Sequence, residues 1–172
     1  MCKKDAGIFI HRTVEVDGFY NATGATLDLV RPGLYQFIES PEPKGKGAVR
    51  VSVGDADLKR KAFAQFAIEF PGKNPAEQGM IRVKLDERTE ALVYPRKGDS
   101  WRITQLDRPT AQYHYKWPEF NTRVGHKIFK QSEVVIDIET GEVLAGSNRY
   151  GRKSPWFFVA LDDPGMSCPR PN

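Results

Sequence analysis

The chain has 172 residues, of which 40% are hydrophobic and 11% aromatic, which is enough apolar surface to build one core and excludes a disordered chain. Its net charge of +4 is shared evenly between the two halves of the sequence, which argues against a nucleic-acid partner because such proteins usually concentrate basic residues on one element. No stretch approaches the roughly 20 apolar residues of a transmembrane helix, so the sequence predicts no membrane span.

The first part of the chain alternates between strand patterns and loops. Apolar residues at every second position predict strands over Gly7–Val16, Leu34–Ile38 and Val49–Val53. The stretches Asp17–Gly24 and Ser40–Gly47 are interrupted by turn-forming residues and predict loops. We therefore expect short strands joined by exposed connections.

The stretch Asp55–Phe70 carries two patterns at once. Asp55 or Asp57 has the side chain of a helix N-cap, whereas the alternating apolar residues of Phe66–Phe70 are typical of a strand. We interpret this stretch as a short helix that runs into a strand.

The second part of the chain contains further β-rich runs. Two of them, within Ser132–Ala145, flank a turn in which Gly141 can adopt the positive φ that a tight hairpin needs. The other predicted strands are Met80–Leu85, Glu90–Tyr94, Trp101–Leu106, Tyr113–Trp117 and Trp156–Leu161. Strands this close together favour an antiparallel sheet over alternating strand and helix units. The sequence thus predicts a mainly β or α+β fold: a single extracytoplasmic domain over residues 1–172, built on an antiparallel sheet with one or two short helices.

The two cysteines, Cys2 and Cys168, lie near opposite ends of the chain. Because domain termini are commonly close together, we expect these cysteines to form a disulfide bond, which is typical of an oxidising, extracytoplasmic compartment. Two alternatives stay open: both are free thiols of a cytosolic protein, or Cys2 is the lipidated first residue of a mature lipoprotein. Because Cys2 directly follows Met1, we also expect that an export signal or membrane anchor has been removed.

Three segments, Cys2–Ile10, Asp137–Gly146 and Arg149–Pro169, together resemble the small uncharacterised exported proteins of proteobacteria, which are periplasmic or membrane-anchored. Those proteins begin with Cys-x-x-Asp-Gly-Gly and end near Ser-Cys-Pro, and this chain departs from the first pattern at Ala6. The resemblance implies a periplasmic or otherwise extracytoplasmic location, with an anchor in the full-length protein as an option. It also implies that the two cysteines belong together, and it implies no catalytic residue.

No catalytic, cofactor or metal motif stands out in the sequence. The three histidines, His11, His114 and His126, occur in separate segments without metal-ligand spacing, and no G-x-S-x-G or phosphate-binding glycine pattern is present. The acidic pair Asp137 and Glu139 falls in the predicted hairpin, where exposure to solvent is the simpler explanation. We therefore expect no catalytic residue, no cofactor and no metal site, and lean toward a protein that is not an enzyme.

The most suggestive binding surface is the stretch Asn148–Trp156, which we expect to be an exposed loop. Arginine next to aromatic side chains is typical of binding hot spots, although ordinary loops collect the same residues. The candidate residues are Arg149, Tyr150, Arg152, Lys153 and Trp156. A second candidate surface, for which core packing is the alternative, consists of Tyr113, Tyr115 and Trp117.

These features favour a non-enzymatic periplasmic binding module, of an inhibitor or immunity type, that acts on another envelope protein. The alternative is an envelope hydrolase whose site is not visible in the sequence, and a deep pocket joining His114 or His126 to a carboxylate would support it. A nucleic-acid binder would need a contiguous basic face, against which the even distribution of charge argues.

Overall fold

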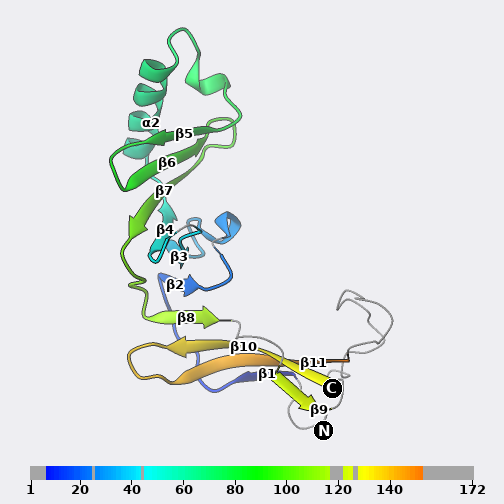
Figure 1. Cartoon of the computed structure of the whole chain (residues 1–172). Coiled ribbons are helices and arrows are strands. Elements are labelled where there is room, and N and C mark those ends of the chain that lie inside the picture. Colours follow the sequence, from blue (N-terminus) through cyan, green and yellow to red (C-terminus); the bar gives the residue numbers. More distant parts are fainter. Residues whose placement is uncertain (1–6, 25, 44, 117–121, 126–127, 153–172) are drawn as a thin grey trace. The chain divides into compact units, whose positions relative to one another are not determined.

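The structure is a computed structural model that describes residues 7–24, 26–43, 45–116, 122–125 and 128–152. The chain forms two compact units: unit 1 comprises residues 1–15 and 112–172, and unit 2 comprises residues 16–111. Strands dominate both units and most strand pairs are antiparallel, which confirms the predicted mainly β fold (Figure 1). The expectation of a single extracytoplasmic domain stays a prediction.

Unit 2 combines a sheet with one α-helix in its described residues. The strands follow the order β2-β3-β4-β7-β6-β5, in which β2 and β3 are parallel and the other neighbours are antiparallel. The elements are β2 (Gly18–Asn21), the 3-10 helix η1 (Leu27–Leu29), β3 (Phe37–Pro41), β4 (Ala48–Val53), α2 (Ala56–Glu69), the 3-10 helix η2 (Pro75–Glu77), β5 (Ile81–Lys84), β6 (Thr89–Tyr94) and β7 (Asp99–Leu106). Strands β4 to β7 confirm four of the predicted strands.

Helix α2 packs against the sheet of unit 2 because its buried residues recur every four positions. The Asp55 carboxylate accepts a hydrogen bond from the Leu58 N–H over 2.7 Å and caps the first turn, as predicted for one of the two candidate caps. Leu58, Ala62 and Phe66 are buried and face β5 and β6, which lie beside the helix (Figure 1). The sheet side of this core consists of Ile81, Val83, Ala91 and Val93.

The predicted strand at Phe66–Phe70 is wrong, since α2 continues to Glu69. Phe66 lies one helical turn after Ala62 and belongs to the buried side of the helix, whereas Ile68 is 72% exposed. The alternation that resembled a strand is therefore the last turn of a helix with one buried side.

A second core of unit 2 consists of Val30, Ile38 and Val51. The Trp101 indole N–H donates to the Val30 carbonyl oxygen over 2.8 Å and so ties β7 to the segment after η1. The predicted strand at Leu34–Ile38 begins only at Phe37. Strand β2 lies in a stretch that the sequence predicts to be a loop. Its four residues have no alternating apolar pattern, and they form a strand because they pair in parallel with β3.

In the described part of unit 1, the strands follow the order β1-β11-β10-β8, β9 also pairs with β10, and every pair is antiparallel. The strands are β1 (Gly7–Ile10), β8 (Tyr113–Lys116), β9 (Thr122–Gly125), β10 (Ile128–Asp137) and β11 (Val143–Arg152). The sheet thus joins a strand from the beginning of the chain to a hairpin from near its end.

The hairpin between β10 and β11 is the one predicted from the sequence. Gly141 has a φ of 72°, and its N–H donates to the Asp137 carbonyl oxygen over 2.8 Å. The Asp137 carboxylate accepts a hydrogen bond from the Glu139 N–H over 3.0 Å and lies 3.6 Å from the Arg12 guanidinium. Asp137 is buried, which corrects the expectation that it is exposed: its charge is tolerated there because it is paired.

The stretch that begins at Asn148 is not a loop in its first part. Residues Arg149–Arg152 continue β11 and pair with β10. Backbone pairing over ten residues outweighs the turn-like composition of Asn148–Trp156. The predicted strand Trp156–Leu161 lies outside the described residues.

The first predicted strand is shorter than its alternating pattern. Strand β1 ends at Ile10 rather than at Val16. After Ile10, the N–H groups of His11 and Arg12 both donate to the carbonyl oxygen of Leu144, over 2.8 and 3.2 Å. Two successive donors on one acceptor interrupt the regular strand ladder, which explains the early end.

Candidate protein-binding face

The strand register determines which side chains of unit 1 share one side of its sheet. Residues directly opposite each other in an antiparallel pair point to the same side. Ile10 is opposite Ala145, and Ala145 is opposite Val135. Val135 is in turn opposite Tyr115. We name this side the isoleucine face, and its members are Ile8, Ile10, Tyr113, Tyr115, Gln131, Glu133, Val135, Asp137, Ala145, Ser147 and Arg149.

Two isoleucines are the most exposed apolar side chains of the isoleucine face. Ile8 is 81% exposed and Ile10 is 64% exposed. Both belong to β1, which is last in the strand order and has β11 as its partner among the described residues. Phe9 points to the opposite side, where a Cβ atom on Gly146 would lie 2.6 Å from its ring. Because Gly146 has no side chain, the Phe9 ring fits against it. Since side chains alternate along a strand, Ile8 and Ile10 then point to the isoleucine face.

Arg149 gives the isoleucine face an accessible positive charge. Its side chain is 71% exposed, and its guanidinium lies 3.8 Å from the Glu133 carboxylate. The Glu133 side chain is only 17% exposed and accepts a hydrogen bond from the Ser147 hydroxyl over 3.3 Å. Because an exposed ion pair of this length contributes little, the cation stays available while the carboxylate is mostly covered.

The two candidate surfaces predicted from the sequence partly coincide in the structure. Tyr113 and Tyr115 are half-buried on the isoleucine face, on the strand that pairs with the far side of β10. Arg149 belongs to the same face through its pairing with Gln131. The register therefore brings a basic and an aromatic part of the sequence to one side of the sheet.

The other predicted residues are located only in part. The backbones of Tyr150 and Arg152 belong to β11. The residues that lie outside the described part of the chain are Cys2, Trp117, Lys153, Trp156 and Cys168. Sequence reasoning missed Ile8 and Ile10 as surface residues, because alternation predicts a half-buried strand without showing whether another element covers it.

In the described part of the chain, the histidines do not form the catalytic site that the hydrolase alternative would need. His114 is 8% exposed and opposite Ile136, on the side of the sheet away from the isoleucine face. His11 is exposed, with its ring centroid 5.3 Å from that of Phe9, and His126 lies outside the described residues. No group of three or more His, Cys, Asp or Glu side chains among the described residues could hold a metal ion.

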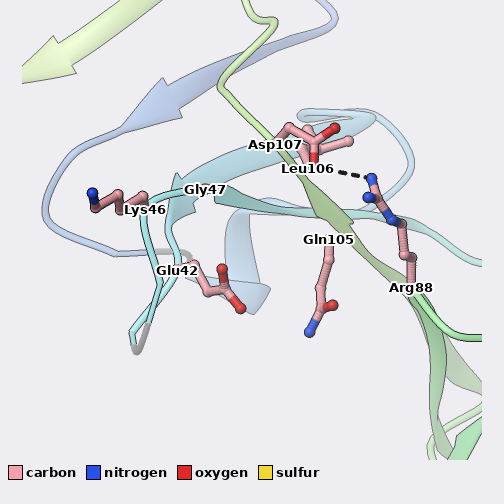
Figure 2. Close-up of a pocket in the computed structure, with 7 residues that line it drawn as sticks. All are labelled: Glu42, Lys46, Gly47, Arg88, Gln105, Leu106 and Asp107. Carbon is pink, nitrogen blue, oxygen red and sulfur yellow. Dashed lines mark ion pairs between the residues drawn. The ribbon is translucent and has the colours of Figure 1, made fainter.

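A polar pocket of about 290 Å³ lies in unit 2. It is lined by Glu42, Lys46, Gly47, Arg88, Gln105, Leu106 and Asp107 (Figure 2). Figure 2 shows Arg88 and Asp107 turned toward each other, and their 3.1 Å ion pair joins side chains that are 61% and 84% exposed. Because charges of both signs line the pocket and its ion pair is exposed to solvent, the pocket has no strong preference for a charged ligand.

The carboxylate of Glu39 in unit 2 is fully buried and accepts several hydrogen bonds. It accepts hydrogen bonds from the Arg50 guanidinium over 2.7 and 3.0 Å and from the backbone N–H groups of Thr110 and Ala111 over 2.7 and 3.0 Å. The Thr110 hydroxyl donates a further bond over 2.8 Å. With its oxygens satisfied in this way, Glu39 anchors the end of unit 2 to β3, which is a structural role.

The environment of Glu39 shifts two pKa values. Burial raises the pKa of Glu39, but the hydrogen bonds from Ala111, Thr110 and Arg50 outweigh burial and hold the pKa below its usual range. Burial also raises the pKa of Tyr20, and the nearby negative charge of Glu39 raises it further. Glu39 is therefore held as a carboxylate and Tyr20 as a neutral phenol at neutral pH.

Comparison of the chain with models of protein families, with curated proteins and with solved structures gives no match. Within the described residues, the helices are too short or too polar to cross a membrane.

Proposed function

We propose that this chain is a non-enzymatic module that binds another protein through the isoleucine face. The observation that carries the proposal is the presence of exposed Ile8 and Ile10 on the same side of the sheet as the exposed Arg149. Exposed apolar area next to polar groups is typical of protein interfaces, in which arginine and tyrosine are enriched. Tyr113 and Tyr115 extend the same face toward β8.

The charge of the face indicates the kind of partner it suits. Because the Glu133 and Asp137 side chains are mostly covered, the exposed Arg149 is a charged group that a partner would meet. A carboxylate beside an apolar patch on the partner would pair with Arg149 and exclude water from it, which strengthens a charge-assisted hydrogen bond. An inhibitor or immunity-type role in the cell envelope is the form of binding that we propose.

We also propose a periplasmic or otherwise extracytoplasmic location and a disulfide bond between Cys2 and Cys168. Strands β1 and β11 are antiparallel neighbours, with Gly7 opposite Asn148. The beginning of β1 and the end of β11 therefore lie at the same end of the sheet. This supports the premise that the two ends of the chain approach each other.

A capture experiment with one charge reversal tests the binding face. Tagged wild type and Arg149→Glu are incubated with bacterial envelope extract, and bound proteins are quantified by mass spectrometry. The matched control is Arg88→Glu in unit 2, since Arg88 is also exposed and paired with a carboxylate. Any partner of the wild type is then purified, and its affinity for all three proteins is titrated.

We expect the affinity of the purified partner to fall at least about tenfold with Arg149→Glu and to change little with Arg88→Glu, because an interface residue changes from an attractive to a repulsive charge. Equal affinity for wild type and Arg149→Glu would show that the partner binds elsewhere and would overturn the isoleucine face as its site.

A further inference from the structure

Strand β1 has the composition of a sheet edge that accepts another strand. Its four residues, Gly-Ile-Phe-Ile, include neither a charged residue nor a proline. Natural edge strands usually carry such residues because they prevent pairing with another chain. Strand β5, the last strand in the order of unit 2, follows this rule with exposed Arg82 and Lys84. Strand β1 lacks this protection.

The backbone groups of β1 alternate between β11 and the free edge. The His11 N–H donates to the Leu144 carbonyl oxygen on β11 over 2.8 Å. Because the direction of the backbone groups alternates along a strand, Phe9 also faces β11. The N–H and C=O groups of Ile8 and Ile10 therefore point away from β11. No described strand pairs with them on that side.

We propose that β1 pairs with β1 of a second copy of this chain, antiparallel and around a two-fold axis at Phe9. In this register Ile8 is opposite Ile10 of the partner subunit, and Ile10 is opposite Ile8 of the partner subunit. Each of these pairs joins two residues whose backbone groups face outward, so the two pairs form four hydrogen bonds. The same strand supplies both halves, as a two-fold interface requires.

The side chains of β1 are also complementary to themselves in this register. Opposite residues share one side of a sheet, so two isoleucines from each copy meet on the isoleucine face. Phe9 meets Phe9 of the partner subunit on the other side, next to Gly146, which makes room for the ring. Cross-strand pairs of β-branched and aromatic residues stabilise sheets.

Charge and size favour a second copy and determine how tightly it binds. Two identical strands repel each other if they carry charge, and β1 carries none. Specific, stable interfaces bury about 1,200–2,000 Å². Pairing of two four-residue strands buries less than this, so the dimer is weak and dissociates on dilution.

The first test measures the mass of the purified full-length protein by analytical ultracentrifugation over a concentration series. Wild type is expected to change from monomer to dimer as its concentration rises toward the millimolar range. The double variant Ile8→Lys/Ile10→Lys is expected to raise the dissociation constant at least about 100-fold, because four lysines meet at the two-fold axis. The control is Ile68→Lys on α2, since Ile68 is 72% exposed and belongs to the other unit, and it is expected to dimerise like wild type.

The second test needs no variant and measures the protection of individual backbone amides in β1. Amide hydrogen exchange is measured at a dilute and at a concentrated condition. The amides of Ile8 and Ile10 are expected to exchange rapidly when dilute and to become protected when concentrated, whereas the Phe9 amide, which faces β11, is protected at both.

Three outcomes would overturn the proposal. A wild type that stays monomeric at every concentration excludes self-pairing, and any loss of an external partner in the lysine variant would then assign the edge to that partner. A dimer that survives Ile8→Lys/Ile10→Lys uses another surface. Protection of the Ile8 and Ile10 amides at every dilution shows that the same chain already covers the edge. None of these outcomes depends on the charge reversal at Arg149, so the proposed binding function is tested separately.

Discussion

The outer strands of the two units differ in whether their apolar side chains are covered. In unit 2, β5 buries Ile81 and Val83 under α2 and exposes Arg82 and Lys84. In unit 1, β1 exposes Ile8 and Ile10. An apolar side chain stabilises a fold only where another element covers it. The covered apolar residues of unit 2 support folding, whereas the uncovered ones of unit 1 lie on the face that we propose binds a partner.

The largest expected effect on the free energy of unfolding comes from the proposed disulfide bond between Cys2 and Cys168. If Cys2 and Cys168 are bridged, reduction is expected to lower the free energy of unfolding by about 4 to 5 kcal/mol, because the bond closes a loop of more than 100 residues in the unfolded chain. The measurement is urea unfolding with and without reductant. Cys168→Ser serves as the control, since reductant should not change its stability.

Titration of free thiols in the unfolded, unreduced protein gives the decisive reading for this bond. No reactive thiol is expected. Two reactive thiols would contradict the bridge and would remove the main support for an extracytoplasmic location.

An intermediate effect is expected at Glu39, the buried carboxylate of unit 2. Glu39→Gln is expected to lower the free energy of unfolding by about 1 to 3 kcal/mol at pH 7, because Arg50 and the N–H groups of Thr110 and Ala111 lose a charged acceptor. Urea unfolding measures the change. Asp107→Asn is the control, since the Asp107 side chain is 84% exposed, and it is expected to change stability by less than about 0.5 kcal/mol.

The stability difference between wild type and Glu39→Gln is expected to change with pH in a defined direction. The pKa of Glu39 is lowered in the folded protein, so its contribution is complete above the unfolded pKa of about 4.3 and is lost as the pH falls through the folded value. The difference in stability between wild type and Glu39→Gln should therefore shrink as the pH falls from 6 to 3. A difference that stays constant or grows over this range would contradict the assignment.

The features predicted correctly from the sequence are those that local patterns determine. Gly141 between two β-rich runs predicts the hairpin, because a tight turn needs its positive φ. Regular alternation in Val49–Val53 predicts a strand for the same local reason. Asp55 was one of two candidate caps, and only the structure distinguishes it from Asp57.

The features that were missed depend on residues far apart in the chain. The local pattern predicts that Phe66 belongs to a strand, yet Phe66 is buried in α2 because the helix packs against β5 and β6. The local composition predicts that Arg149 belongs to a loop, yet pairing with β10 extends β11 through this residue. Alternation predicts that Ile8 and Ile10 are half-buried, and only their exposure in the folded structure, 81% and 64%, shows that they are largely uncovered. Tertiary pairing and covering are not encoded in a short window of sequence.

The proposed function requires that the isoleucine face is free for binding rather than part of a core. The most direct test is the free energy of unfolding of Ile8→Lys/Ile10→Lys, measured in urea at a dilution where any dimer has dissociated. We expect a change of less than about 0.5 kcal/mol per substitution, whereas Ile81→Ala in the core of unit 2 should cost about 2 to 5 kcal/mol. A loss of more than about 2 kcal/mol in the lysine variant would contradict the claim, because it would show that these isoleucines are buried when the whole chain is folded.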